Sequence, residues 1–299
     1  MQYTGNMRSF EVWPGPMEGV GRGGFITAVN RLDLVPQWMT PFFRVSQDIP
    51  RNGKMREFLE PFKANPVPVC VQLMGTDPVL IGKCAAIFAG MDIASINLNF
   101  GCPSSRVISS GAGGGALRSP GNLPDFCRIV KSFMPDDLPL SVKIRAGWDD
   151  PEEMDEIIPL LAACPEVSKI FFHCRTVREL YVELPVEERL NRFSRAVELA
   201  GCVPVIINGD ISTVAEGESA VEKSGAAGVM IARPWMRDPW LLRRFDDSNV
   251  PDAETGREQF FAEAVKQQLP QGALIELALM LWGRDSIHFR KLIADKKTE

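Results

Sequence analysis

Short apolar runs recur along the chain, and each is followed by a turn rich in glycine, proline or asparagine. Most of these runs are apolar at nearly every position, which is typical of parallel strands that are buried on both faces. The pattern therefore predicts eight strands, within residues 11–20, 34–43, 67–75, 95–103, 138–147, 168–176, 203–211 and 228–234.

Amphipathic stretches fill the later gaps and predict helices at 77–90, 122–134, 151–164, 186–201, 212–225 and 235–245. The first helix begins with Asp77 as the expected N-cap and Pro78 at the first helical position. Eight strand-then-helix units within residues 1–245 predict an α/β fold, a (β/α)₈ TIM barrel. The alternative is an open doubly wound sheet, but no GxGxxG motif follows the first strand, and eight repeats favour closure.

The pattern changes after Phe245. Residues 246–256 are polar and turn-rich and predict a linker, whereas 257–268 and 273–297 predict two helices. We therefore expect a barrel domain at 1–245 and a short helical tail at 246–299. The tail ends in a cationic face made of Arg290, Lys291, Lys296 and Lys297. Such a face is either a solvated helix C-terminus with favourable dipole charges or a nucleic-acid patch.

The composition limits which partners and which cellular compartment we expect for this chain. The formal net charge is −5, so a nucleic acid would have to be bound by a local basic patch within an acidic average. The seven cysteines form no CxxC pair and their number is odd, which favours thiols in a reducing compartment over disulfides or a zinc site. No segment has the apolar length of a signal peptide or a membrane span. We expect a cytoplasmic protein without metal or membrane, and favour a monomer.

In this fold the active site forms at the C-terminal ends of the strands. Polar or charged residues end the apolar runs at 16–19, 43–44, 72, 99–103, 143–145, 173–175, 208–210 and 232–233. The last two tips predict a phosphate site, because loops after strands seven and eight commonly bind phosphate in such barrels. Gly209 allows close backbone approach and Arg233 offers a guanidinium. The alternative is a structural turn at Gly209 and a surface arginine.

Several segments fall in the order and spacing of the tRNA-dihydrouridine synthases, and the chain resembles this family from about Pro14 to Trp240. The segments are PMEGV, FFRV, VQLMG, INLNFGCPSSRVISSGAGGGAL, SVKIRAGW, FHCRT, VIINGDI and GVMIARP. The most specific is N-x-G-C-P followed by a glycine-rich run. The triple glycine at 113–115 is similar to the bacterial C-type subfamily.

The resemblance implies an enzyme that uses FMN, with NADPH as reductant, to reduce the C5–C6 double bond of a uridine in tRNA. The implied catalytic residue is Cys102. The implied cofactor contacts are Pro16, Met17, Gln72, Lys143, His173, Asn208, Gly209, Asp210, Ala232 and Arg233. The implied substrate contacts are Asn99, Arg145 and Arg175. The resemblance also implies that the barrel at 1–245 is the FMN-binding catalytic domain and that the tail at 246–299 binds tRNA.

The chemistry explains why a cysteine fits this role. Reduction of uracil takes a hydride at C6 and a proton at C5. The acid must be protonated at neutral pH and still release its proton, and a thiol with a pKa near 8.5 meets both conditions. We assign the role to Cys102. Small buried hydrophobes are the expectation for Cys70, Cys84, Cys127 and Cys164.

A uridine in folded tRNA must leave its stack to reach a barrel mouth. An aromatic side chain at the mouth would stabilise the flipped base by stacking. The candidates are Phe42, Phe100 and Tyr181, with core packing as the alternative for each.

Three positions depart from the family pattern. Ser105 stands where a basic residue often follows C-P, so an RNA contact has moved or is absent. Cys174 replaces the glycine of H-G-R-T and is expected to place a second thiol near the site. Ala232 stands where a glycine usually precedes the last-strand arginine, and its methyl is expected to crowd the phosphate.

Two other functions remain open. One is an FMN-dependent barrel oxidoreductase that acts on a free small molecule, which the acidic charge and short tail favour. The other is an inactive homologue that binds RNA or flavin without turnover.

Overall fold

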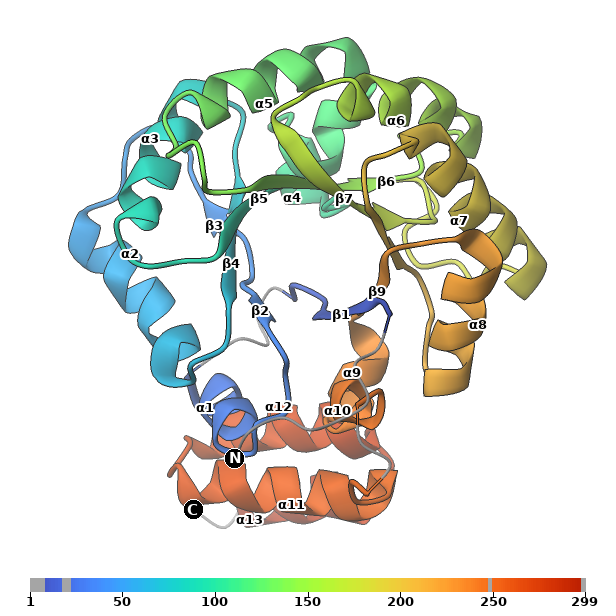
Figure 1. Cartoon of the computed structure of the whole chain (residues 1–299). Helices are drawn as coiled ribbons and strands as arrows, with labels where there is room; N and C mark the ends of the chain where they lie inside the picture. Colours follow the sequence, from blue (N-terminus) through green and yellow to red (C-terminus); the bar gives the residue numbers. More distant parts are fainter. Residues whose placement is uncertain (1–8, 18–22, 247–248, 297–299) are drawn as a thin grey trace.

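In the computed structural model, residues 9–17, 23–246 and 249–296 are described. Their strands form one parallel sheet that curls into a nearly closed barrel, with helices around the outside (Figure 1). The strands are β1 (Glu11–Pro14), β2 (Trp38–Met39), β3 (Phe43–Arg44), β4 (Val69–Met74), β5 (Ser95–Phe100), β6 (Leu140–Arg145), β7 (Val167–His173), β8 (Val205–Asn208) and β9 (Gly228–Ile231). The predicted TIM barrel is confirmed.

The strand order is β1-β9-β8-β7-β6-β5-β4-β2, and β3 pairs with β4 beyond β2. The predicted second strand is therefore split into β2 and β3. Pro41 lies between the two pieces, and a proline cannot donate a ladder hydrogen bond. Where the strand order ends, Nε2 of Gln37 donates to the carbonyl of Val12 at 3.1 Å and links the segment before β2 to β1.

Most of the predicted barrel helices are confirmed. The helices of the barrel are α1 (Gly23–Arg31), α2 (Asn52–Leu59), α3 (Pro78–Ala89), α4 (Ser105–Ile108), α5 (Leu123–Lys131), α6 (Met154–Ala162), α7 (Val186–Ala200), α8 (Val214–Ser224), α9 (Arg233–Arg237) and α10 (Leu241–Arg244). Asp77 caps α3 as expected, since its carboxylate accepts from the N–H groups of Val79 and Leu80. The stretch predicted as one helix at 235–245 is two helices, with Pro239 in the break. Helices α1, α2 and α4 were not predicted.

Alternation along the strands separates two apolar regions. In β5, Ile96 and Leu98 join the large core between the sheet and the helices, so Asn97 and Asn99 face the barrel interior. A second, smaller cluster fills the interior and consists of Trp13, Met39, Cys70, Phe171, Ile206 and Met230. Interior polar residues lie next to this cluster, since Gln72 follows Cys70 on the same face of β4 and Lys143 pairs with Phe171.

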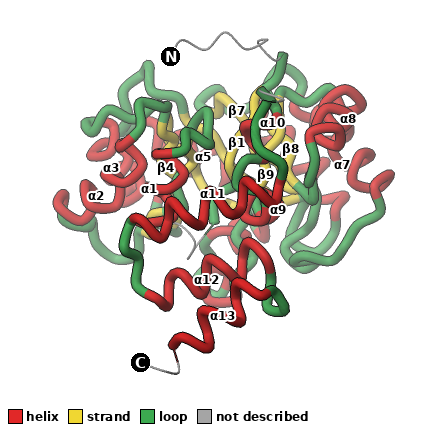
Figure 2. Tube along the Cα trace, turned by 90° about the horizontal axis from the view of Figure 1, so that it is seen from below, coloured by secondary structure: helices red, strands yellow, loops and turns green. Residues whose placement is uncertain are grey.

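The tail has three helices, α11 (Ala253–Lys266), α12 (Gln271–Trp282) and α13 (Ile287–Lys296), where the sequence predicted two. The second predicted helix is broken at Gly283, whose φ of +85° suits glycine. The tail lies beside α1, α9 and α10 (Figures 1 and 2). Phe260 of α11 packs edge-to-face on Phe25 of α1, with ring centroids 5.2 Å apart. The tail is therefore docked against the barrel.

Two parts of the predicted cationic face, the Lys296 side chain and Lys297, lie outside the described residues. Within the described part of the chain, no helix has the length and apolar character needed to cross a membrane.

Candidate active site

A cavity of about 770 Å³ opens at the C-terminal ends of the strands, within the range of about 300–1,000 Å³ that small-molecule sites occupy. All but two of the predicted site residues line it. These are Pro16, Met17, Asn99, Cys102, Lys143, Arg145, His173, Asn208, Gly209, Asp210, Ala232 and Arg233. The two exceptions are Gln72 and Arg175.

Cys102 lies in the cavity wall, on the loop directly after β5. Oδ1 of Asn99 accepts hydrogen bonds from the N–H groups of Gly101 at 3.1 Å and Cys102 at 2.9 Å. Nε of Arg145 donates to the carbonyl of Gly101 at 2.9 Å. Two N–H groups and one carbonyl of the loop are thus hydrogen-bonded to side chains. The half-buried thiol therefore has a defined place in the cavity wall.

Lys143 lies on β6 and faces the same cavity. Burial lowers the pKa of Lys143 to about 7, and the positive charge of Arg145 acts in the same direction. A negative charge on Cys102 would favour the protonated lysine. The ammonium of Lys143 is therefore held close to its titration point, and any anion in the cavity would favour its charged form.

His173 ends β7 and is buried in the cavity wall. Burial, followed by the charges of Arg145 and Lys143, lowers its pKa well below the usual 6.5. The imidazole is therefore neutral at pH 7. Its Nδ1 accepts from the backbone N–H of Arg175 at 3.2 Å, so the single ring proton is on Nε2. His173 is a hydrogen-bond donor at this site.

Arg175 does not line the cavity, unlike the other two predicted substrate contacts, Asn99 and Arg145. Its side chain has 0% exposure and forms an ion pair with Asp210. Its Nε donates to the carbonyl of Val182. The guanidinium is thus buried against the loop that follows β7, and the substrate contact of Arg175 stays a prediction. Its role is to hold the protein's own loop.

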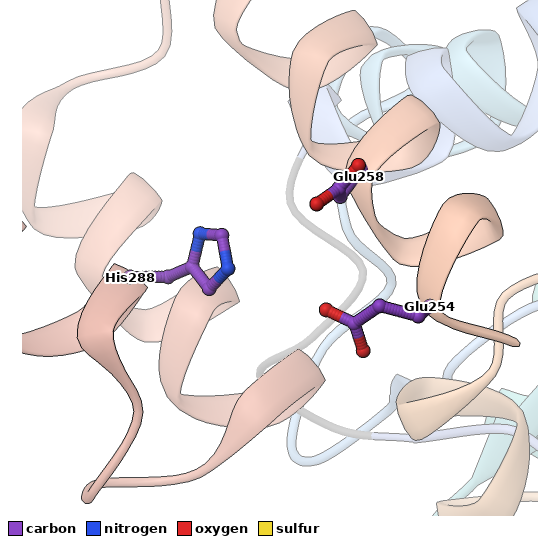
Figure 3. Close-up of side chains that lie close together, drawn as sticks. All are labelled: Glu254, Glu258 and His288. Atoms are coloured by element: carbon purple, nitrogen blue, oxygen red, sulfur yellow. The ribbon is translucent and has the colours of Figure 1, made fainter.

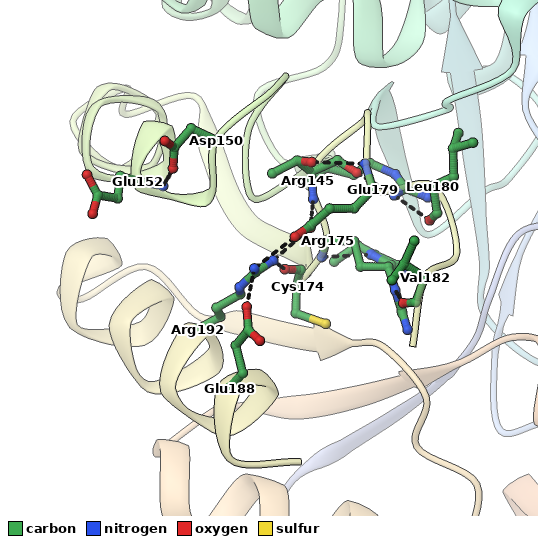
Figure 4. Close-up of polar contacts among 12 residues, drawn as sticks. Arg145, Asp150, Glu152, Cys174, Arg175, Glu179, Leu180, Val182, Glu188 and Arg192 are labelled. Atoms are coloured by element: carbon green, nitrogen blue, oxygen red, sulfur yellow. Dashed lines mark hydrogen bonds and ion pairs between the residues drawn. The ribbon is translucent and has the colours of Figure 1, made fainter. Parts of the chain in front are cut away.

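Arg145 also holds this loop, although its side chain lines the cavity as well. Its Nη1 donates to the carbonyls of Thr176 at 2.8 Å and Leu180 at 2.9 Å (Figure 4). Arg192 of α7 completes the arrangement by bonding the carbonyl of Cys174 and the carboxylate of Glu179 (Figure 4). Arginines from three places in the barrel thus fix residues 174–182 at the cavity rim.

This fixed loop presents Tyr181 to the cavity. Tyr181 is 56% exposed. The guanidinium of Arg233 lies 4.8 Å from its ring centroid and that of Arg145 lies 5.6 Å away. The ring therefore lies close to two guanidiniums while part of it remains open to solvent.

Of the three aromatic candidates for base stacking, Tyr181 and Phe42 line the cavity. Phe100 does not. It is 2% exposed and packs edge-to-face on Phe126 in the outer core. Core packing is therefore the correct interpretation for Phe100, since its position in β5 points to the helices.

Gln72 also differs from its predicted place. It is fully buried beneath the cavity. Its Oε1 accepts from Nδ2 of Asn99, and its Nε2 donates to Oδ1 of Asn97, both at 2.8 Å. With its amide used in this way, Gln72 orients Asn99, and its contact with a flavin stays a prediction.

The predicted phosphate end brings together the tips of β8 and β9. Asn208 donates from Nδ2 to the carbonyl of Met230 at 2.7 Å. Gly209 has a φ of +146°, and a Cβ there would lie 2.4 Å from Sγ of Cys174, so a side chain is excluded. Arg233 is half-exposed and pairs with Asp210 at 2.7 Å. An incoming phosphate would have to compete with that carboxylate for Arg233.

The three departures from the family pattern have clear structural settings. Cys174 is buried beneath Gly209, and burial raises the pKa of its thiol to about 11. It does not line the cavity. The methyl of Ala232 faces Gly15, where an added Cβ would lie only 2.5 Å away. Ser105 begins α4 and lines the cavity.

Several lining residues were not predicted, namely Gly15, Ser104, Leu180, Ile211, Met230, Ile231 and Pro234. Most of them flank a predicted tip, so their position was the available signal. Leu180 flanks no predicted tip; it lies in the loop that the arginines hold, with a φ of +49°.

A separate polar cluster lies in the tail (Figure 3). Glu254 and Glu258 of α11 and His288 of α13 have potential metal-ligand atoms within 4.8 Å of one another. Glu254 already accepts from Nε1 of Trp282 at 2.8 Å and from Arg257. The imidazole of His288 stacks on Trp282 at 4.1 Å. These contacts account for the cluster as a link between tail helices.

The fold and the site define a TIM-barrel protein with a cavity that is lined by a thiol, a neutral imidazole and a lysine whose pKa is lowered by burial. The family profile of dihydrouridine synthase (Dus) matches residues 14–276. The chain therefore belongs to the dihydrouridine synthase family.

Curated relatives agree with this assignment. A probable tRNA-dihydrouridine synthase of Rickettsia typhi is 35% identical over 60% of this chain and 53% of its own length. A tRNA-dihydrouridine(16) synthase of Vibrio vulnificus is 31% identical over 76% of this chain and 72% of its own length. The chain thus spans about half the length of the Rickettsia relatives it matches.

Solved structures add support for the fold alone. A 2-naphthoyl-CoA reductase complex has a TM-score of 0.62 at 10% identity and covers 85% of this chain and 53% of that one. The aldolase QR15 has a TM-score of 0.51 at 10% identity, covering 76% and 91% of the two chains.

Proposed function

We propose that this protein is an FMN-dependent tRNA-dihydrouridine synthase that reduces the C5–C6 double bond of a uridine. The observation that carries the proposal is the placement of Cys102, Lys143 and His173 around one cavity, in a chain of the dihydrouridine synthase family. The names of the curated relatives support tRNA as the substrate.

The residues present fit FMN. The cavity has a suitable volume, and its donor set combines an ionisable lysine, a neutral imidazole N–H and the half-exposed Arg233. Lys143 would compensate negative charge on the cofactor, and Arg233 with the tips of β8 and β9 would hold the phosphate. Bound FMN would supply the hydride to C6, after reduction by NADPH.

Cys102 would deliver the proton to C5 of the uracil. The thiol S–H bond breaks as the new C5–H bond forms, which leaves a thiolate that later regains a proton from solvent. Lys143 lies where its charge interacts with Cys102, so its ammonium would stabilise that thiolate. General acids placed in this way contribute about 10²–10⁴-fold.

Asn99 and His173 would orient the reactants. The amide of Asn99 fixes the Cys102 loop and also lines the cavity. The Nε2–H of His173 would donate to a carbonyl oxygen of the flavin or the uracil. Tyr181, at the rim, offers a surface for a base that has left its stack.

The proposal is tested by anaerobic single-turnover reduction. Flavin-reconstituted protein is reduced by NADPH and mixed with unmodified tRNA, and dihydrouridine is mapped by mass spectrometry. Reoxidation of the flavin with one dihydrouridine formed per flavin is the expected result. A chain that binds flavin and reduces free uracil derivatives or enones but not tRNA would be a small-molecule oxidoreductase. A chain that takes up no flavin would contradict the proposal at its first step.

A further inference from the structure

Side-chain hydrogen bonds connect three strands inside the barrel. Gln72 of β4, Asn97 of β5 and Ser141 of β6 are direct neighbours in the sheet register. All three are buried, as is Asn99, the fourth member. The bonds that join the four side chains are 2.8–2.9 Å long. We call these four residues the amide chain.

A backbone acceptor fixes one end of the amide chain. Oγ of Ser141 donates to the carbonyl of Ile96 at 3.2 Å, so the hydroxyl oxygen accepts from Nδ2 of Asn97. Asn97 must then present its Oδ1 to Gln72, which donates from Nε2. All four side chains therefore donate in the same direction, from Asn99 through Gln72 and Asn97 to Ser141.

Backbone donors fix the other end. Gln72 presents Oε1 to Nδ2 of Asn99, so Oδ1 of Asn99 faces the N–H groups of Gly101 and Cys102. Reversing one amide would set two oxygens or two NH₂ groups face to face. Each buried polar group left unsatisfied costs about 1–3 kcal/mol. The orientation of Asn99 is therefore supported from both sides, by the backbone donors of the loop and, through Gln72, by Asn97 and Ser141.

We propose that Asn97 and Ser141 are positioning residues for the Cys102 loop, acting through Gln72 and Asn99. As a role in catalysis this rests on the proposed function, in which Cys102 is the acid. Neither Asn97 nor Ser141 lines the cavity, so neither would touch a reactant. Their effect is to keep the acceptor of Asn99 aimed at the loop that carries the thiol.

The surroundings of the amide chain favour a positioning role over a purely structural one. The neighbouring interior of the barrel is filled by an apolar cluster, and apolar residues of similar volume would pack here without buried polar groups to satisfy. Buried polar networks that are fully satisfied favour one arrangement over others. In this molecule the hydrogen bonds of the amide chain lead to the backbone N–H of Cys102.

The first test measures the loop without flavin or tRNA. Ser141→Ala removes the acceptor at the far end with little change in volume, and Asn97→Leu removes the link itself. Backbone hydrogen exchange at Gly101 and Cys102 is expected to accelerate in both variants, while the amides of β5 to β7 stay protected. Alkylation of Cys102 by iodoacetamide, followed by peptide mass spectrometry with exposed Cys202 as internal reference, is expected to change several-fold.

Asn30→Leu is the matched control. Asn30 of α1 is also buried, donates to the carbonyl of Pro61 at 2.8 Å and accepts from Nε1 of Trp38 at 2.9 Å, away from the cavity. It is expected to lower the melting temperature without changing exchange or alkylation at the Cys102 loop. Parental exchange and alkylation in Ser141→Ala and Asn97→Leu would overturn the proposal, and so would the same loop changes in Asn30→Leu.

The second test measures turnover. In Ser141→Ala, single-turnover uridine reduction is expected to slow by up to about 10²-fold, the scale of an ångström-sized misplacement, with KM for tRNA and flavin reduction by NADPH unchanged. A rise in KM with kcat unchanged would contradict positioning of the acid. If the parental chain reduces no uridine, the proposed function fails, whereas the exchange and alkylation results still decide whether the amide chain positions the loop.

Discussion

Cys102 and Cys174 each follow the end of a barrel strand, yet their surroundings give them opposite properties. Cys102 is half-buried in the cavity wall, whereas Cys174 is sealed beneath Gly209 with its pKa raised to about 11. The same residue type is therefore available to a reactant at one tip and excluded from it at the other.

This contrast gives the first prediction. Cys102→Ala is expected to leave flavin binding and flavin reduction by NADPH intact, and to slow uridine reduction by about 10²–10⁴-fold, because only that step uses the acid. Cys174→Ala is the control and is expected to retain most activity. Single-turnover oxidation by unmodified tRNA measures the step. Parental rates in Cys102→Ala, or inactivity in Cys174→Ala alone, would refute the assignment.

The second prediction at the residue scale concerns the folding stability that is lost because the ammonium of Lys143 is buried. Its folded pKa of about 7 is below the usual 10.5, so the unfolded chain binds more protons between these two values. The destabilising effect of the buried ammonium is therefore full below pH 7 and shrinks as pH rises towards 10.5. Lys143→Met is expected to stabilise the flavin-free protein, and more at pH 6 than at pH 9.

Thermal unfolding of the two proteins at both pH values measures this difference. Arg178→Met provides a comparison at an exposed cation, whose side chain is 64% exposed, and no such pH-dependent gain is expected there. Destabilisation by Lys143→Met at pH 6 would contradict the inferred cost.

At the scale of elements, the ends of β1 and β9 meet through Gly15 and Ala232. The N–H of Gly15 donates to the carbonyl of Ile231 at 2.7 Å, and an added Cβ would lie 2.5 Å from Cβ and 3.0 Å from Cα of Ala232. Gly15 thus accommodates the methyl that the sequence led us to expect against the phosphate.

A double-mutant cycle tests this pairing. Gly15→Ala is expected to destabilise the protein by about 1–3 kcal/mol, the usual cost of overpacking, and to lower flavin content. Ala232→Gly alone is expected to have a small effect, and the double variant to recover most of the stability. Denaturant unfolding and flavin absorbance measure both quantities. Additive effects in the double variant would show that the two positions are independent.

Element prediction from sequence succeeded where periodicity and capping agreed, as at Asp77 before α3. It failed where one residue broke a pattern that continued on both sides. Pro41 divides the second strand position, and Gly283 divides the last predicted helix. In both cases the apolar pattern was unaffected, and backbone geometry at a single position decided the outcome.

The site shows the same limit. The strand-tip rule placed Cys102, Lys143 and His173 together because parallel strands end at one edge of a barrel. It could not separate Arg145, which lines the cavity, from Arg175, which is buried against Asp210. That difference depends on the fold of residues 174–182, which no periodicity encodes.

For the whole molecule, the central question is how a chain of net charge −5 would bind tRNA. The tail offers exposed Arg290 and Lys291 on α13. Arg290 pairs with Asp285 at 3.3 Å, but both side chains are largely exposed, and such surface pairs contribute little stability. These cations can therefore be exchanged for acidic residues while the fold is kept.

The final prediction uses that exchange. Arg290→Glu combined with Lys291→Glu is expected to weaken tRNA binding and to reduce the salt dependence of the affinity by about 1 in log–log slope for each phosphate that is no longer neutralised. Flavin content and melting temperature are expected to stay at parental values. Lys54→Glu combined with Arg56→Glu on α2, also exposed, changes the net charge equally and is the control for a general charge effect. Equal weakening in both double variants would assign RNA binding to overall charge, whereas parental affinity in the α13 variant would remove the tail from the RNA-binding surface and favour a small-molecule substrate.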